Sequence, residues 1–262
     1  MPQTSGADGL APSGGDAVVE LSSTVEGNAL GVADSRCSAY PNQMARKPPL
    51  AIPTLQATAS EFAQVESFHG EPTLYGVTDG KAVGTYLELK FRSYLLERFT
   101  FIEGNAASGI DLPELLVDLK TTSIRQPQSS CPFKSGRQKV FGLGYSLLVF
   151  VYEKTDDHDA KTGRLDIQHV IFIDAPQTGD FQMTRGLREI LERDGNVDDL
   201  MAFMADKNLP VDEIELRRIA EEVLTKEPAQ GYLTVSNALQ WRLQYARAIS
   251  HAGAVTGIRR VR

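Results

Sequence analysis

Three short apolar runs, each long enough for one β-strand, constrain the fold of this chain most strongly. They cover residues 115–122, 146–152 and 165–174. Two charged residues interrupt the first run, and a polar stretch at 155–163 is suited to a hairpin loop between the other two. Segments with helical spacing of apolar residues flank these runs. We therefore predict an α/β fold in which a mixed central β-sheet is flanked by helices, with helical additions at the C-terminal end.

The helical segments are recognised by apolar residues three or four positions apart. The first begins near Gly84 and places Leu87, Phe91, Leu95 and neighbouring aromatic residues on one face. Further helices are predicted at 187–191, 197–204 and 211–224, and a last one from Ser236 to about residue 249.

The domain organisation follows from composition. Residues 1–50 are rich in Gly, Ala and Ser and lack periodicity, which predicts a flexible tail. Residues 51–262 form one domain in this interpretation, with its core at about 84–174 and a helical part at about 184–250. No apolar run approaches the roughly 20 residues of a membrane span, and the N-terminus lacks signal-peptide features, so we expect a cytoplasmic protein without a membrane partner.

The charge distribution is uneven. The formal net charge is −7, yet residues 119–152 and 228–262 contain no acidic residue and hold several lysines and arginines. Two basic surfaces on an acidic body are compatible with DNA binding, although chance clustering of charge is an alternative explanation.

The chemistry-bearing pattern is Asp118-Leu119-Lys120 inside the first apolar run. Side chains alternate along a strand, so Asp118 and Lys120 share one face, about 6 to 7 Å apart along the backbone. Burying charge is costly, and an ordinary core strand would carry apolar residues at both positions. An edge-strand salt bridge is the purely structural alternative.

Asp111 precedes this strand by a short turn that ends near Leu115. A bend there would bring its carboxylate beside that of Asp118, and a cation between the two would relieve their repulsion. Mg²⁺ fits, because it takes hard oxygen ligands and retains waters. Lys120 would then orient or activate the attacking water and stabilise charge on a phosphate.

Asp111 followed by Asp118-Leu119-Lys120 resembles the active-site pattern of the PD-(D/E)XK nuclease superfamily, and most closely that of a type II restriction endonuclease. The resemblance covers about residues 84–174 and implies a restriction-endonuclease-like fold, Mg²⁺-dependent hydrolysis of double-stranded DNA at a specific sequence, and a homodimer. It also implies a catalytic acid on the preceding helix, at Glu88; a surface pair between Glu88 and Arg92 is the alternative. The pattern departs from the family at Ile110, where a proline is usual, which leaves Glu114 as a substitute for Asp111.

Polar side chains after the Asp118-Leu119-Lys120 strand are candidates for DNA contact. Arginine can form hydrogen bonds with guanine, glutamine can form them with adenine, and hydroxyl groups can donate to phosphates. We predict contacts from two parts of the chain: Arg125, Gln126, Gln128, Ser129, Ser130, Lys134 and Arg137 near the strand, and Asn237, Gln240 and Arg242 on the last helix. Two other functions remain: a nuclease of the same superfamily that acts in DNA repair or recombination, and a non-catalytic DNA-binding module.

Overall fold

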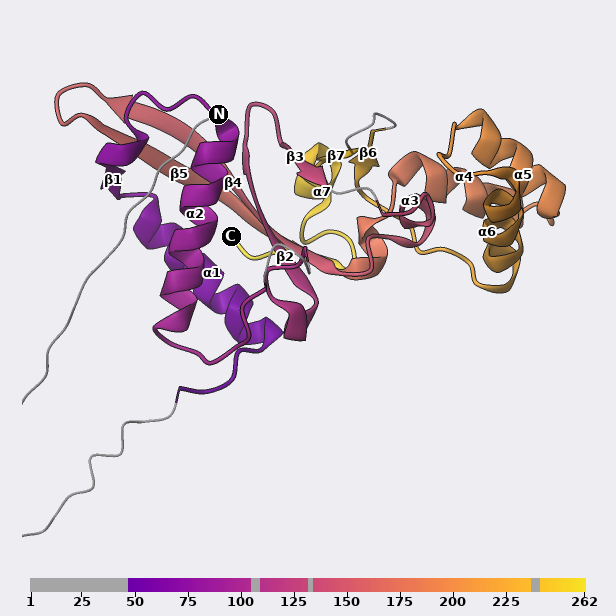
Figure 1. Ribbon diagram of the computed structural model, residues 1–262, viewed down its shortest axis with the longest axis horizontal. Helices are drawn as coiled ribbons and strands as arrows, with labels where there is room; N and C mark the ends of the chain where they lie inside the picture. Colours follow the sequence, from indigo (N-terminus) through magenta and orange to yellow (C-terminus); the bar gives the residue numbers. More distant parts are fainter. Residues whose placement is uncertain (1–46, 105–108, 132–133, 237–240) are drawn as a thin grey trace, which may run out of the picture. The chain divides into compact units, whose positions relative to one another are not determined.

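The computed structural model describes residues 47–104, 109–131, 134–236 and 241–262. Within this part of the chain, a central sheet has the strand order β1-β5-β4-β2, with β8 added to β5, and a smaller sheet has the order β3-β7-β6 (Figure 1). The strands are β1 (Gly70–Glu71), β2 (Val117–Ser123), β3 (Gln128–Cys131), β4 (Ser146–Asp157), β5 (Thr162–Ile173), β6 (Thr234–Val235), β7 (Trp241–Gln244) and β8 (Ile258–Arg260).

The described part of the chain also contains α-helices and short 3-10 turns. The α-helices are α1 (Ile52–Glu66), α2 (Gly80–Leu96), α3 (Arg137–Phe141), α4 (Phe181–Leu191), α5 (Val197–Asp206), α6 (Glu213–Thr225) and α7 (Ala246–His251). Short 3-10 turns are η1 (Pro72–Leu74), η2 (Pro113–Leu115) and η3 (Ala175–Thr178). The predicted α/β class and the helices predicted at 187–191, 197–204 and 211–224 are confirmed.

The central sheet is mixed, as predicted. Strand β2 runs parallel to β4, while β4 and β5 form a long antiparallel hairpin. The hairpin extends beyond the predicted strands, since β4 continues to Asp157 and β5 starts at Thr162. Both faces of β4 are buried, which explains its unbroken apolar run.

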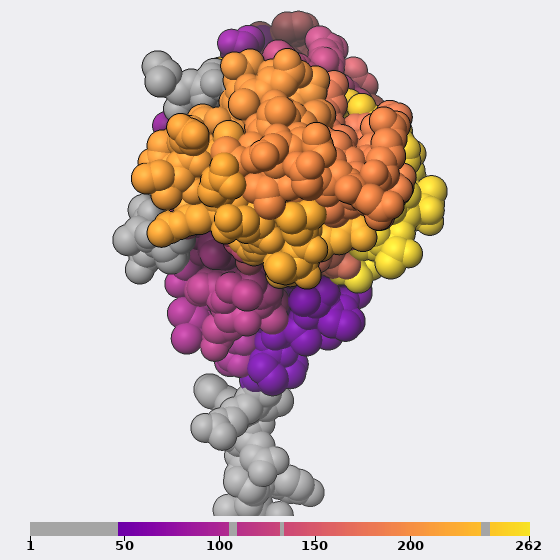
Figure 2. Space-filling view, turned by 90° about the vertical axis from the view of Figure 1, so that its right-hand side faces the viewer, coloured from indigo at the N-terminus to yellow at the C-terminus, as the bar shows by residue number. Residues whose placement is uncertain are grey.

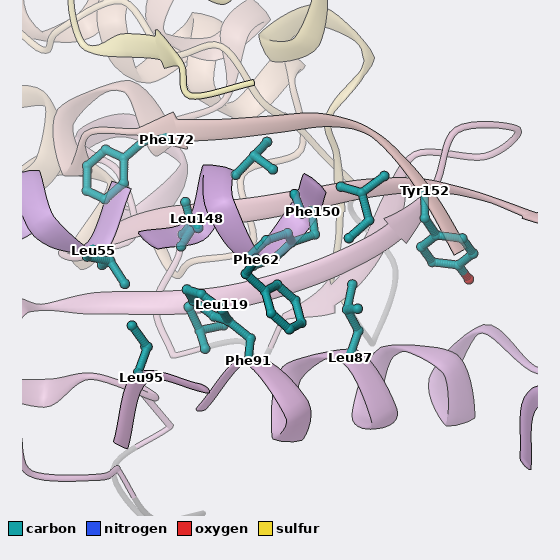
Figure 3. Close-up of a cluster of buried hydrophobic side chains, with 14 of the residues drawn as sticks. Leu55, Phe62, Leu87, Phe91, Leu95, Leu119, Leu148, Phe150, Tyr152 and Phe172 are labelled. Carbon is teal, nitrogen blue, oxygen red and sulfur yellow. The ribbon is translucent and has the colours of Figure 1, made fainter. Parts of the chain in front are cut away.

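One face of the central sheet packs against α1 and α2. Phe62 of α1, Phe91 of α2 and Phe150 of β4 meet here, with ring centroids 5.1 Å apart for Phe62 and Phe91 and 4.9 Å apart for Phe91 and Phe150 (Figure 3). Leu119 of β2 and Leu87 of α2 complete the same cluster. This core therefore ties α2 to the strand that carries the Asp118-Leu119-Lys120 pattern.

The other face of the sheet packs against the smaller sheet and α7. Leu147, Val149 and Val151 of β4 lie in this second core together with Leu243 of β7 and Tyr245. A third cluster joins α3, α4, α5 and α6. The orange surface that faces the viewer in Figure 2 belongs to the segment of α4, α5 and α6.

Two predictions about the ends of the domain need revision. Helix α1 was not predicted, although Leu55, Ala59, Phe62 and Ala63 carry a helical spacing; the prolines before it were interpreted as part of a tail. Of that tail, residues 1–46 lie outside the described residues, and Leu50 donates a backbone hydrogen bond to Thr100 at 3.0 Å.

The predicted helix from Ser236 to residue 249 is wrong at residues 241–244, which form strand β7, and a helix begins at Ala246. Residues 237–240 lie outside the described residues. Leu243 and Tyr245 are fully buried, while Arg242 and Gln244 are exposed. This alternation of buried and exposed residues is typical of a strand, and it fits the segment better than the spacing of three or four residues that a helix requires.

Among the described residues, no helix is both long enough and apolar enough to cross a bilayer.

The packing of α2 on β2 predicts unequal effects of two similar substitutions. Leu87 is fully buried, whereas Leu89 on the same helix is 50% exposed. Leu87→Ala should lower the free energy of unfolding by about 2–5 kcal/mol through lost burial and a cavity. Leu89→Ala, the matched control, should change it by roughly 0.5 kcal/mol or less. Urea denaturation of both variants measures the difference, and equal losses would contradict this packing.

Candidate active site

A tight bend brings Asp111 next to β2. The chain turns through η2, Leu116 takes a left-handed conformation with φ of 51°, and Leu112 then pairs with Val117 as an isolated bridge. The Asp111 carboxylate thus reaches β2, where its Oδ2 accepts a hydrogen bond from the backbone N–H of Leu119 at 3.0 Å. The structure therefore contains the bend that the sequence predicted before the catalytic strand.

Asp118 and Lys120 share one face of β2. Val117 and Leu119 are fully buried in the core beneath α1 and α2, so the alternating side chains of Asp118 and Lys120 point to the opposite face. Lys120 Nζ lies 2.6 Å from Asp118 Oδ2. The side chain of Asp118 is only 6% exposed and that of Lys120 18%, so this ion pair is well shielded from water.

The surroundings make the Asp118 carboxylate unusually basic. Burial raises its pKa to about 6, the Lys120 ammonium opposes this rise, and the neighbouring Asp111 carboxyl adds to it. The main cause is the loss of solvation of Asp118, and the charge of Asp111 adds a smaller contribution. A divalent cation between them would remove that penalty.

Lys120 stays protonated in the same environment. Burial alone would lower the pKa of its ammonium, but the carboxylates of Asp118, Glu88 and Asp111 outweigh burial and hold that pKa above its usual value. A permanently charged ammonium is suited to orienting water and stabilising an anion, and poorly suited to accepting a proton.

Glu88 lies on α2, beside β2. Burial raises the pKa of its carboxyl to about 7, while the Lys120 ammonium lowers it and the charges of Asp111 and Asp118 raise it. The alternative pairing of Glu88 with Arg92 is not formed, because Arg92 Nη1 lies 3.7 Å from Asp111 Oδ1 instead. Glu88 therefore belongs electrostatically to the group around Lys120.

Glu114, the possible substitute for Asp111, points elsewhere. It is exposed, and its Oε2 accepts a hydrogen bond from the backbone N–H of Ile102 at 2.9 Å. Asp111 is the acid that the bend brings to the strand.

The available donors fit Mg²⁺ in kind and number. Within the described part of the chain, no three His, Cys, Asp or Glu side chains come together closely enough to enclose a metal ion. Mg²⁺ does not require such a cage, since one or two carboxylates, several waters and a substrate phosphate commonly hold it. The carboxylate oxygens of Asp111 and Asp118 are donors of that kind.

A cleft of about 1090 Å³ is lined by Lys120 and Glu88, while neither Asp111 nor Asp118 is among its lining residues. Its wall includes Glu88 and Lys120 together with most of the residues predicted to contact DNA, namely Arg125, Gln126, Gln128, Ser129, Ser130 and Arg242. Gln128, Ser129 and Ser130 belong to β3, which pairs with β7 and so meets Arg242. The tertiary structure therefore collects two segments that are more than 100 residues apart in the sequence.

The other predicted DNA contacts are not collected in this cleft. Arg137 makes a close ion pair with Glu222 of α6, and Lys134 is exposed outside the residues that line the cleft. Asn237 and Gln240 lie outside the described residues.

Two lysines in the cleft wall were not predicted. Lys81 follows Asp79, the N-cap of α2, and Lys154 lies on β4. The N-cap signal of Asp79 was readable, but nothing in the sequence indicated that the start of α2 faces β3.

Comparisons with known proteins identify the family of this chain. The family model described as type II restriction enzyme NspV matches residues 49–260. The type II restriction enzyme NspV of Nostoc sp. (strain ATCC 29411 / PCC 7524) is 63% identical over 209 residues, which cover 80% of this chain and 95% of that enzyme. No solved structure matches the chain. The chain therefore belongs to the family of the type II restriction enzyme NspV, which confirms the resemblance to restriction endonucleases.

Proposed function

We propose that this chain hydrolyses both strands of duplex DNA with Mg²⁺ held by Asp111 and Asp118, and that Lys120 and Glu88 assist at the same site. As a member of a type II restriction enzyme family, the chain is a site-specific DNA endonuclease and hence a hydrolase. That membership favours this function over a repair nuclease or a non-catalytic DNA-binding module. The proposal adds to this activity the identity of the metal and the role of each residue.

One observation carries the proposal. Asp111 and Asp118 converge at β2, where Asp111 bonds the Leu119 N–H at 3.0 Å and Asp118 contacts the Lys120 ammonium at 2.6 Å. A purely structural ion pair needs neither the second carboxylate nor the cleft beside it. Buried charge pairs are also poor stabilisers, because desolvation offsets their attraction.

Each residue has a distinct task in this arrangement. When bound, Mg²⁺ would polarise the scissile phosphate and lower the pKa of a water ligand. Arg92 and the Leu119 N–H hold the Asp111 carboxylate in place. Lys120, charged and flexible, would contact the phosphate or the attacking water and offset the negative charge that grows in the transition state.

Glu88 has the properties of a proton-handling group. Its pKa of about 7 means that the carboxyl changes charge near neutral pH, and it lines the cleft next to Lys120. An acid with such a pKa exchanges protons efficiently at neutral pH. We therefore place Glu88 beside the reacting water.

Removal of the Lys120 ammonium should abolish most cleavage without unfolding the chain. We expect Lys120→Ala and Asp118→Asn each to slow plasmid cleavage in Mg²⁺ by at least about 100- to 1000-fold, the loss seen when a transition-state donor is removed. Single-turnover cleavage rates measure this effect, and circular dichroism confirms the fold.

Matched controls lie away from the cleft. Lys226→Ala at the exposed end of α6 and Asp166→Asn on β5 remove the same charges and should keep cleavage within about twofold. Wild-type rates in Lys120→Ala or Asp118→Asn would rule out this active site.

Mg²⁺ affinity should increase with pH between about 5 and 7. The pKa of the metal ligand Asp118 is raised to about 6, so its carboxyl holds a proton in the lower part of this range, and this proton competes with the metal. Below the pKa of about 6 for Asp118, each pH unit should weaken binding about tenfold. Isothermal titration calorimetry of Mg²⁺ binding to the unmodified protein without DNA measures this dependence. A pH-independent affinity would contradict metal binding by Asp118.

Cleavage of both strands calls for two active sites, so we propose a homodimer related by a twofold axis. Analytical ultracentrifugation of the chain with a duplex that contains its site should show two chains per duplex. A monomer that cuts both strands in one binding event would contradict this assembly.

A further inference from the structure

The small sheet beside the active site has two chemically different faces. On one face, Leu243 is fully buried and Cys131 and Val235 are buried with it. The Ser129 hydroxyl points to this side as well, because its Oγ lies 2.5 Å from the hydroxyl of the buried Tyr245. The alternate residues of β3 and β7 must therefore face the other way.

The opposite face is polar throughout. Gln128 pairs with Gln244, and Ser130 pairs with Arg242, as cross-strand neighbours in the antiparallel register of β3 and β7. Ser130, Arg242 and Gln244 are exposed and Gln128 is partly exposed. Within the described part of the chain, the side chains of these four residues form no hydrogen bond or ion pair. They are available to a ligand.

We propose that β3 and β7 enter the major groove of the DNA as a two-stranded ribbon, and that Gln244, with Gln128, reads an A·T base pair while Arg242, with Ser130, reads a G·C base pair. This inference rests on the proposed function, since it requires duplex DNA in the cleft. It adds Gln244 to the specificity residues and assigns Ser129 to support of the ribbon through Tyr245.

The dimensions of the ribbon suit this role. The major groove admits a two-stranded β-ribbon. Glutamine forms bidentate hydrogen bonds with adenine, and arginine forms them with guanine. Side chains two residues apart on a strand are separated by about 6.7 Å, close to two base-pair steps of about 3.4 Å. The Gln128–Gln244 row and the Ser130–Arg242 row would thus address base pairs two steps apart when the strands follow the groove.

The ribbon also lies in the correct place. Gln128, Ser130 and Arg242 line the same cleft as Glu88 and Lys120. The Thr122 hydroxyl at the end of β2 donates to the Gln128 carbonyl at 3.1 Å and accepts from its N–H at 2.8 Å. These two bonds fix β3 directly to the catalytic strand, so base reading and phosphate cleavage share one rigid support.

Cleavage of a duplex library that is randomised at each position of the recognised site tests this proposal in Mg²⁺. Gln244→Ala should lose about 5- to 150-fold of the preference for A·T at one position of each half-site and keep the preference elsewhere. Arg242→Ala should lose G·C preference by a similar factor at a different position, two steps away. Gln182→Ala, an exposed glutamine on α4 outside the cleft, is the matched control and should leave the profile unchanged.

The outcomes separate this inference from the proposed function. If the unmodified chain fails to cut any duplex in Mg²⁺, the proposed function fails. If it cuts with clear preference and Gln244→Ala keeps that profile, only the ribbon assignment is overturned. A uniform loss of rate over all sequences would likewise overturn base reading, because it indicates a phosphate contact.

Discussion

The pairing of β2 with β4 determines the direction of the Asp118 and Lys120 side chains at the candidate active site. In the observed register, Asp118 lies opposite Leu147 and Lys120 opposite Val149, while Leu119 enters the core beneath α2. A shift by one residue would turn the two charged side chains into that core and expose Leu119. The apolar residues of β2 therefore stabilise the fold and, through strand alternation, orient the catalytic groups.

Asp111 depends on a second local feature, the bend at η2. Its carboxylate is anchored by the Leu119 N–H and approached by Arg92 of α2, so a hairpin, a strand and a helix meet at one acid. The Asp118–Lys120 pair alone would be an ordinary, weakly stabilising buried ion pair. The second carboxylate raises the electrostatic cost of the site, and that cost is what a cation would relieve.

Chemistry and recognition are physically joined in this chain. Strand β2 carries Asp118 and Lys120 at its middle, and Thr122 near its end bonds both backbone polar groups of Gln128 in β3. Strand β3 in turn pairs with β7, which brings Arg242 and Gln244 to the same side. Contacts to bases through this ribbon would thus be transmitted to the catalytic strand by short hydrogen bonds within two sheets.

The sequence by itself determined the α/β class, the three main strands, the helices between residues 184 and 225 and the Asp111, Asp118 and Lys120 pattern, because local apolar spacing and the cost of buried charge can be recognised from the order of residues alone. It did not determine β7, because the residues of Trp241–Gln244 fit the apolar spacing of a helix as well as that of a strand. Pairing with β3 makes this segment a strand. Nor could it separate Arg125 and Arg242, which line the cleft, from Arg137, which Glu222 of α6 holds in an ion pair. Contacts between distant segments arise only when the chain packs, so tertiary structure alone decided which polar residues face the cleft.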